Sequence, residues 1–228
     1  GYEIIEDIRR YALLDLSEFG VPQKRKRIIL VGLNKKYFKG DLQNILKEFY
    51  VSILGSYRED NMTVKDAISD LPKFFPSENE KKVGRKKYSH YPEKTNISDH
   101  YPRYHNKRDI EIFKELAWDI EALKKLYTER TGKESNIHKY NVLKWDKPSN
   151  TIPAHLKKDG LRHIHPDYLQ ARSITVREAA RLQTFDDDFE FTGNASADYE
   201  MIGNAVPPKF SFKLANALYE LIKKQELL

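Results

Sequence analysis

Residues 172–185 read Arg-Ser-Ile-Thr-Val-Arg-Glu-Ala-Ala-Arg-Leu-Gln-Thr-Phe, and residues 202–208 read Ile-Gly-Asn-Ala-Val-Pro-Pro. In the first segment Thr175 and Glu178 have the spacing of a capping box, in which each side chain bonds the backbone amide of the other. A helix is therefore predicted to run to about Gln183. In the second segment Pro207 and Pro208 suit the first turn of a final helix, where a missing amide costs little.

A third segment lies near the start of the chain, where residues 19–32 read Phe-Gly-Val-Pro-Gln-Lys-Arg-Lys-Arg-Ile-Ile-Leu-Val-Gly. Gly20 and Pro22 interrupt regular structure, so we predict strand, turn and strand over residues 3–33. The aliphatic run from Ile28 to Val31 is typical of a strand that is buried on both faces. Because two strands alone are marginally stable, this piece is predicted to complete a larger sheet.

In order and separation, the three segments resemble the second half of a DNA (cytosine-5) methyltransferase. The resemblance implies an α/β fold, in which the end of a Rossmann-like methyltransferase sheet is joined to a small mixed α+β target-recognition domain. Residues 1–50 would be the last strands of the catalytic domain, residues 51–170 the recognition domain, and residues 171–228 helices that return to the catalytic domain. Within the middle part, residues 63–72 and 145–152 resemble the segments that border the recognition domain.

The resemblance also implies a chemistry that this chain does not complete. In the family a cysteine adds to cytosine C6, a glutamate assists at N3, and S-adenosylmethionine gives its methyl group to C5. The chain contains no cysteine, so the nucleophile and the glycine-rich cofactor turn are expected in an N-terminal catalytic half. We expect a C-terminal part or subunit that is inactive without that half, and Gly1 in place of Met suggests a processed product, an excised domain or a segment.

Three residues of the third segment, residues 19–32, are assigned to the catalytic pocket by resemblance. Arg27 is expected to contact the flipped cytosine and its backbone, while Arg25 supports the pocket and nearby phosphates and Gln23 has a supporting role. Arginine suits these tasks because it stays charged and offers several donors to phosphates and to a ring carbonyl that becomes more negative. Without its flanking residues, the run 24–27 would more often be a solvated basic turn.

The second segment resembles the family block that helps to enclose S-adenosylmethionine, which would be shared with the N-terminal half. Gly203 permits close backbone approach and Asn204 offers both a donor and an acceptor. The resemblance points to Asn204, Ala205 and Val206 as cofactor-side residues, and a plain turn before a helix is the alternative. The first segment resembles the block that holds the recognition domain against the catalytic one, with Arg177 and Arg181 reaching acceptors across a domain seam.

The partner that the resemblance implies is double-stranded DNA. The formal net charge of +6 favours an acidic partner without identifying it. Dense basic runs occur at residues 24–27 and 81–87, although such runs are more often solvated faces. Arg, Lys, Asn and Gln are the usual base readers, and the recognition region offers Arg85, Lys86, Lys87, Arg103, Asn106, Lys157 and Lys158. Its tyrosines, Tyr88, Tyr91, Tyr101 and Tyr104, are more simply explained as half-buried loop residues than as stacking partners of bases.

Further elements follow from local patterns. Thr63 is a plausible N-cap of a short helix that ends at Leu71, and residues 74–105 are expected to be irregular. A second helix should begin near Asp109, because apolar residues recur at helical spacing. They are Ile112, Phe113, Leu116, Ile120, Leu123 and Tyr127. Residues 151–152 and 163–164 are candidate strand centres.

Several classes of protein are disfavoured. The absence of cysteine excludes disulfides and thiolate metal sites, and the spacing of the histidines fits no standard zinc pattern, so no metal is expected. No apolar stretch reaches the ~20 residues of a membrane span. A bacterial, cytoplasmic, nucleoid-associated enzyme of a restriction-modification system is expected.

Two rival functions stay open. One is a stand-alone DNA-binding module, and the other is a degenerate gene remnant without catalysis. A partner sequence immediately upstream with Phe-x-Gly-x-Gly, Pro-Cys and Glu-Asn-Val blocks would favour a split enzyme, and its absence would favour a remnant.

Overall fold

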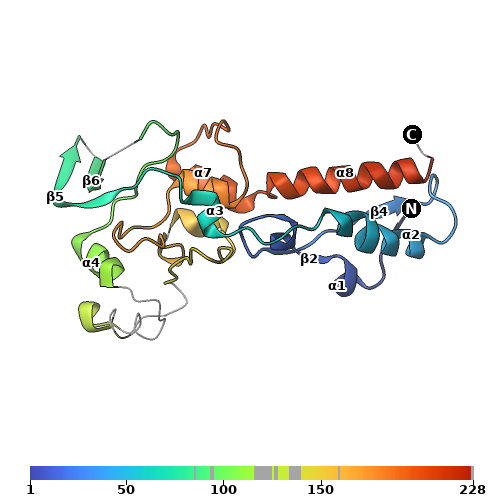
Figure 1. Ribbon diagram of the computed structural model, residues 1–228, viewed down its shortest axis with the longest axis horizontal. Helices are drawn as coiled ribbons and strands as arrows, with labels where there is room; N and C mark the ends of the chain where they lie inside the picture. Colours follow the sequence, from blue (N-terminus) through green and yellow to red (C-terminus); the bar gives the residue numbers. More distant parts are fainter. Residues whose placement is uncertain are drawn as a thin grey trace.

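The computed structural model describes residues 1–84, 86–92, 95–115, 125, 128–133, 140–158 and 160–226, without the side chains of residues 79, 80 and 83. The molecule is elongated, with both termini at one end and a β-hairpin near the other (Figure 1). Its buried apolar residues form separate clusters along this length. The chain is therefore organised as successive small cores.

The first core contains the N-terminal residues and the last helix. β1 (Tyr2–Ile4) pairs antiparallel with β4 (Gly32–Asn34), and β2 (Leu13–Asp15) pairs antiparallel with β3 (Lys26–Ile28). The helical elements here are α1 (Ile8–Tyr11), η1 (Leu16–Phe19), α2 (Leu42–Glu48), η2 (Phe49–Ile53), η3 (Leu54–Tyr57) and α8 (Pro208–Lys224). Phe19 packs edge-to-face on Phe210 of α8, so α8 closes this core. As predicted, Pro208 occupies the first turn of α8.

The expectation of a strand at residues 28–31 that is buried on both faces is wrong. The pairing is interrupted between β3 and β4, and Ile28 and Leu30 are 58% and 53% exposed. Only Ile29 and Val31 pack against the first core. The aliphatic run is therefore buried on one face, because β3 has β2 as its neighbour and no element among the described residues covers the other face.

The second core lies in the middle of the molecule. It contains α3 (Val64–Ile68), η5 (Ala154–Lys157), α6 (Val176–Leu182) and α7 (Ala195–Asn204). Both predicted N-termini are confirmed: Thr63 forms a capping box with Asp66, and Thr175 forms one with Glu178. α6 ends at Leu182, with Gln183 as its C-cap. Both boxes satisfy amides at a helix start that have no partner within the helix, and those of the Thr175 box are buried.

The far end of the molecule contains a hairpin and a third core. β5 (Phe75–Val83) pairs antiparallel with β6 (Lys86–Tyr91), so the expectation of irregular structure is wrong for this segment. The base of the hairpin is fixed from outside, because His90 Nε2 lies 2.9 Å from the carbonyl oxygen of Gln170. α4 (Lys107–Glu115) begins near the predicted start and packs Ile112 and Phe113 into the third core. Its predicted continuation through Leu116, Ile120, Leu123 and Tyr127 lies outside the described residues.

The two expected strand centres do not form strands. Ile164 makes only isolated bridges, to Val142 and to Ser173. The chain between the two expected centres contains the short helix η6 (Gly160–Arg162). The amide of Ile152 bonds the side chain of Gln23 at 3.0 Å in place of a neighbouring strand. A side-chain acceptor thus satisfies the amide of Ile152, whereas the amide of Ile164 bonds the carbonyl of Asn141 at 3.0 Å.

The helices of residues 171–228, expected to form one part, pack in two different cores. α6 and α7 share a core with α3, whereas α8 shares one with residues 1–57. The boundaries at residues 50 and 170 stay predictions. Among the residues that the structure describes, no helix is both long enough and apolar enough to cross a membrane.

Candidate nucleic-acid interface

A buried polar network joins the three sequence segments. Arg25 is 3% exposed. Its Nη1 donates to the Oε1 of Gln23 at 3.3 Å and to the carbonyl of Ile152 at 3.1 Å. Its Nη2 donates to the carbonyls of Gly203 at 2.9 Å and Ala205 at 3.1 Å. One guanidinium thus holds together the turn at Gln23, the loop at Ile152 and the end of α7.

Gln183 completes this network, and sequence reasoning missed it. Its Oε1 accepts from the Nε2 of Gln23 at 3.0 Å, and its Nε2 donates to the carbonyl of Ile202 at 2.6 Å. Gln23 also donates to the carbonyl of Leu182 at 3.3 Å. Both glutamines are fully buried. The available signal was the position of Gln183 at the predicted end of a helix, where a buried amide can bond free carbonyls.

The environment of Arg25 makes it a positioning residue. Burial, together with the nearby charge of Arg27, lowers its pKa to about 10. Its donors face backbone and amide oxygens, and its Nε has no partner among the described residues. The expected contact of Arg25 with phosphates is therefore not supported, because the side chain is enclosed by the loops it connects.

Arg27 has the opposite environment. It is exposed, and its Nη1 donates to the carbonyl of Lys26 at 2.7 Å. Along the segment Gln23 and Arg25 point inward, while Lys24, Lys26 and Arg27 are on the surface. The buried residues hold the turn in place, and Arg27 projects from it with donors that can reach an external acceptor.

The Gly-Asn segment lies at the end of α7. A Cβ on Gly203 would lie 2.3 Å from the amide nitrogen of Ala154, so the two backbones touch and the predicted close approach is real. The group approached is a loop of this chain. Asn204 and Val206 are exposed, and the carbonyl of Ala205 is held by Arg25. The side chains of Asn204 and Val206 are thus available to a ligand.

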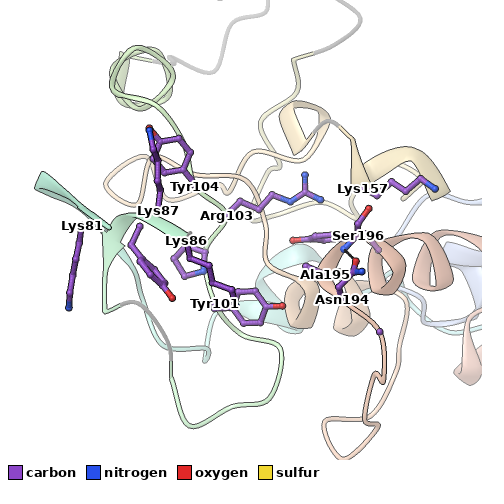
Figure 2. A pocket seen from close by; sticks show the side chains of 14 residues that line it. Lys81, Lys86, Lys87, Tyr101, Arg103, Tyr104, Lys157, Asn194, Ala195 and Ser196 are labelled. Atoms are coloured by element: carbon purple, nitrogen blue, oxygen red, sulfur yellow. Dashed lines mark hydrogen bonds between the residues drawn. The ribbon is translucent and has the colours of Figure 1, made fainter. Parts of the chain in front are cut away.

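A large basic pocket lies between the hairpin and the start of α7, with a volume of about 1100 Å³. Its cationic lining residues are Lys81, Lys86, Lys87, Arg103 and Lys157. Figure 2 shows Arg103 extending between the hairpin lysines and Lys157. Tyr88, Tyr101, Tyr104 and Tyr199 also line it. Cations interleaved with aromatic rings are typical of surfaces that bind nucleic acid.

Arg103 is held firmly within this pocket. Its guanidinium carbon lies 4.0 Å from the centroid of the Tyr199 ring, and its Nη2 donates to the carbonyl of Leu156 at 2.7 Å. Tyr199 is itself buried, and its hydroxyl donates to the carbonyl of Ile174 at 2.8 Å. The guanidinium of Arg103 is therefore held in a fixed position, in contrast to the ammonium of a lysine on a flexible stem.

The pocket collects four of the seven candidate base readers: Lys86, Lys87, Arg103 and Lys157. Lys157 forms a salt bridge with Glu200, which neutralises part of its charge. The side chain of Asn106 bonds the first turn of α4, where its Oδ1 accepts from the amide of Asp109 at 2.9 Å. Lys158 is exposed but does not line this pocket. Arg85 lies outside the described residues.

The segment of residues 172–185 is organised around a buried ion pair. Arg172 donates to both carboxylate oxygens of Glu178 at 2.7 Å. Burial alone would raise the pKa of Glu178, but the charge and hydrogen bonds of Arg172 hold it below its usual range. Arg177 and Arg181 bond carbonyls and carboxylates of other segments, including the carbonyl of Ser98 at 3.0 Å. The helix therefore connects several loops, and its expected place at a domain seam stays a prediction.

The histidines are mostly internal. Burial lowers the pKa of His90 to about 4 and that of His105 to about 3. His105 Nε2 accepts from the amide of Ser173 at 3.1 Å, and His100 lies 2.8 Å from the carbonyl of Pro72. Among the described parts of the chain, no group of three or more His, Cys, Asp or Glu residues could hold a metal ion.

Comparison with known proteins gives a consistent set of relatives. A family model described as C-5 cytosine-specific DNA methylase matches residues 1–220. Type II methyltransferase M.Bpa9945I of Bacillus paralicheniformis is 34% identical, over 97% of this chain and 54% of its own length. Type II methyltransferase M.Eco47II of Escherichia coli is 33% identical, over 98% of this chain and 48% of its own length.

The fold has a relative among solved structures. A protein from E. coli, described as a prophage-encoded DNA modification methyltransferase, matches with a TM-score of 0.61 and 24% identity. The match covers 97% of this chain and 61% of that chain. The present chain thus spans about half the length of the curated relatives cited above, and its α/β fold is that of a methyltransferase.

Proposed function

Because the chain belongs to the C-5 cytosine-specific DNA methylase family, we propose that it is the C-terminal part of a DNA (cytosine-5) methyltransferase. In this proposal it recognises a duplex DNA site and helps to form the pockets for the flipped cytosine and for S-adenosylmethionine. It is inactive without an N-terminal catalytic half, because the nucleophilic cysteine of the family is absent from its 228 residues.

The observation that carries this proposal is the network around Arg25. The three segments with family resemblance are far apart in the sequence, yet Gln23, Arg25 and Gln183 bond one another or the carbonyls of Gly203 and Ala205. Such a network fixes loops relative to each other, although burial of its polar groups costs free energy of desolvation. A fixed arrangement is what a pocket shared by a base and a cofactor requires.

Arg27 would act on the cytosine. Its exposed guanidinium projects from a turn that the network holds in place. A charge-assisted hydrogen bond to the cytosine ring carbonyl would strengthen as a nucleophile adds to the ring and negative charge develops. Asn204 and Val206, exposed at the end of α7, would contribute to the cofactor side.

The need for a second half is supported by the N-terminal strands. Their exposed faces carry large apolar side chains that would normally be covered. They are Tyr2, Ile4, Leu13 and Ile28, and Leu30 is exposed in the link between β3 and β4. Both strand pairs are also only two strands wide. Additional strands of a catalytic half, packed on these faces and edges, would bury this surface and complete a methyltransferase sheet.

The test is complementation. The partner is the polypeptide encoded immediately upstream or, where there is none, the N-terminal half of M.Bpa9945I. Tritium transfer from S-adenosylmethionine to duplex DNA is measured for each half and for the mixture, and complex formation is followed by size-exclusion chromatography. We expect transfer only in the mixture. Transfer by this chain alone would contradict the proposal.

The basic pocket favours one alternative, a stand-alone DNA-binding module. The cations that line it belong to the hairpin, the loop before α4 and η5, so duplex binding would not need a catalytic half. DNA binding by the chain with no complex and no transfer in the mixture would support this alternative. Absence of binding and of transfer would instead support a remnant without function.

A further inference from the structure

An oriented chain of hydrogen bonds runs through two buried glutamine side chains. The backbone amide of Ile152 donates to Gln23 Oε1 at 3.0 Å, and Gln23 Nε2 donates to Gln183 Oε1 at 3.0 Å. Gln183 Nε2 in turn donates to the carbonyl of Ile202 at 2.6 Å. All three donors point the same way, from the loop at Ile152 to the end of α7, and hydrogen bonds arranged in this way strengthen one another.

The partners at the two ends fix the orientation of both side-chain amides. A backbone N–H can only donate, so Ile152 requires the oxygen of Gln23 on its side. A backbone carbonyl can only accept, so Ile202 requires the nitrogen of Gln183. Both glutamines are fully buried, so solvent does not compete for these partners. Each side chain therefore has one arrangement that satisfies its neighbours.

The chain of bonds ends next to the residues expected on the cofactor side. Gly203 has no room to move toward η5, because a Cβ on it would lie 2.3 Å from the backbone of that element. Ile202, held by Gln183, precedes it. The segment between these two restraints and α8 presents Asn204 and Val206 on the surface. An amide beside an apolar side chain suits a ligand that, like S-adenosylmethionine, has both polar and apolar parts.

We propose that Gln183 is a positioning residue for the cofactor side of the site, because it fixes Asn204 and Val206 relative to the turn that carries Arg27. This inference rests on the proposed function and gives a role within it to a side chain that acts only through its neighbours. A cofactor bound at a fixed place relative to the cytosine is what methyl transfer between them requires.

Replacement of Gln183 by methionine is informative because it leaves neither partner without a hydrogen bond. Gln23 Nε2 would keep the carbonyl of Leu182 at 3.3 Å, and the carbonyl of Ile202 would keep the amide of Ala205 at 3.3 Å. The variant is therefore expected to fold, with the loss visible in the position and order of the segment.

Hydrogen exchange of the whole chain gives the first readout. In Gln183→Met the backbone amides of residues 203–206 should exchange about fivefold faster, the equivalent of one net hydrogen bond. The matched control is Gln43→Met, because Gln43 also bridges two segments, donating to the carbonyl of Ile4 at 2.9 Å, but belongs to α2 of the first core. Circular dichroism melting verifies that each protein folds. Unchanged exchange at residues 203–206 would overturn the proposal.

Steady-state kinetics with a saturating N-terminal half give the second readout. A displaced cofactor-side segment should raise the KM for S-adenosylmethionine about fivefold and leave the KM for duplex DNA unchanged. The Kd of S-adenosylhomocysteine, the demethylated cofactor, measured by equilibrium dialysis, should rise by the same factor. A side chain that only stabilised the fold would lower the active fraction, and hence kcat, at a constant KM.

Gln183→Glu separates the two ends of the side chain. It keeps an oxygen for Gln23 but has no donor for the carbonyl of Ile202, so the KM for S-adenosylmethionine should rise at least as much as in Gln183→Met. If the parent mixture transfers methyl groups and either variant keeps the parental KM, the assignment of Gln183 fails and the proposed function stands. If the parent mixture transfers none, both fail.

Discussion

Replacement of Arg25 by methionine would remove a cation that four acceptors share in the buried network. The carbonyls of Ile152 and Gly203 would lose a partner, whereas Gln23 Oε1 would still accept from the amide of Ile152. Each buried carbonyl left without a partner costs about 1–3 kcal/mol. Removal of a buried charge, whose Nε has no partner among the described residues, offsets part of this cost. We therefore expect a loss of about 2–4 kcal/mol in the free energy of unfolding.

The assay is urea unfolding followed by circular dichroism, with duplex DNA affinity measured on the same proteins. Arg25→Lys should be intermediate, because a point charge cannot reach acceptors on three segments. Lys24→Met, an exposed neighbour, should change stability by less than about 0.5 kcal/mol. An Arg25→Met protein as stable as the parent would refute the reasoning. Unchanged stability with weakened DNA binding would instead indicate that Arg25 contacts DNA phosphates.

The remaining predictions concern acid stability and backbone packing. Burial lowers the pKa of His90 and His163 to about 4 and that of His105 and His165 to about 3. Because the unfolded histidines bind protons below pH 6.5, stability should be complete above that value and fall as the pH drops toward 4, and a flat unfolding profile by fluorescence would contradict this. Gly203→Ala should lower the free energy of unfolding by about 1–3 kcal/mol, because its Cβ would meet backbone. Gly40→Ala, with open space around its Cβ, is the control for steric contact, although its positive φ adds strain of its own.

Local patterns predicted the elements whose signals are local. The capping boxes at Thr63 and Thr175 and the proline turn before α8 depend on residues within a few positions of each other. The start of α4 was also predictable from the spacing of its apolar residues. Tertiary context does not override such short-range signals when the same residues also face a core.

The hairpin could not be predicted for a physical reason. Its strands contain proline, serine, asparagine and a lysine run, which have low strand propensity and no alternation of apolar residues. The ladder is held by contacts distant in sequence, such as that of His90 with Gln170. The one-sided burial of the run at residues 28–31 likewise depends on which neighbours a strand has, which periodicity does not encode.

The site was predicted in part. The segment 23–27 was identified, but a basic run gives no indication that Arg25 points inward while Arg27 points outward. That difference arises because Ile152, Gly203 and Ala205 supply carbonyls on one side only. Gln183 was missed for the same reason, since its partners are assembled by the fold.

The measurement that tests the central claim most directly is single-turnover methylation by the complemented enzyme with Arg27→Ala. If Arg27 stabilises the cytosine ring carbonyl as it becomes negative, the rate should fall by the equivalent of about 2–4 kcal/mol. DNA affinity should fall far less, because many phosphate contacts contribute to it. Arg27→Lys should restore only part of the rate, and Lys26→Ala is the matched control. A loss of affinity as large as the loss of rate would place Arg27 on the DNA backbone, and an unchanged rate would contradict its catalytic assignment.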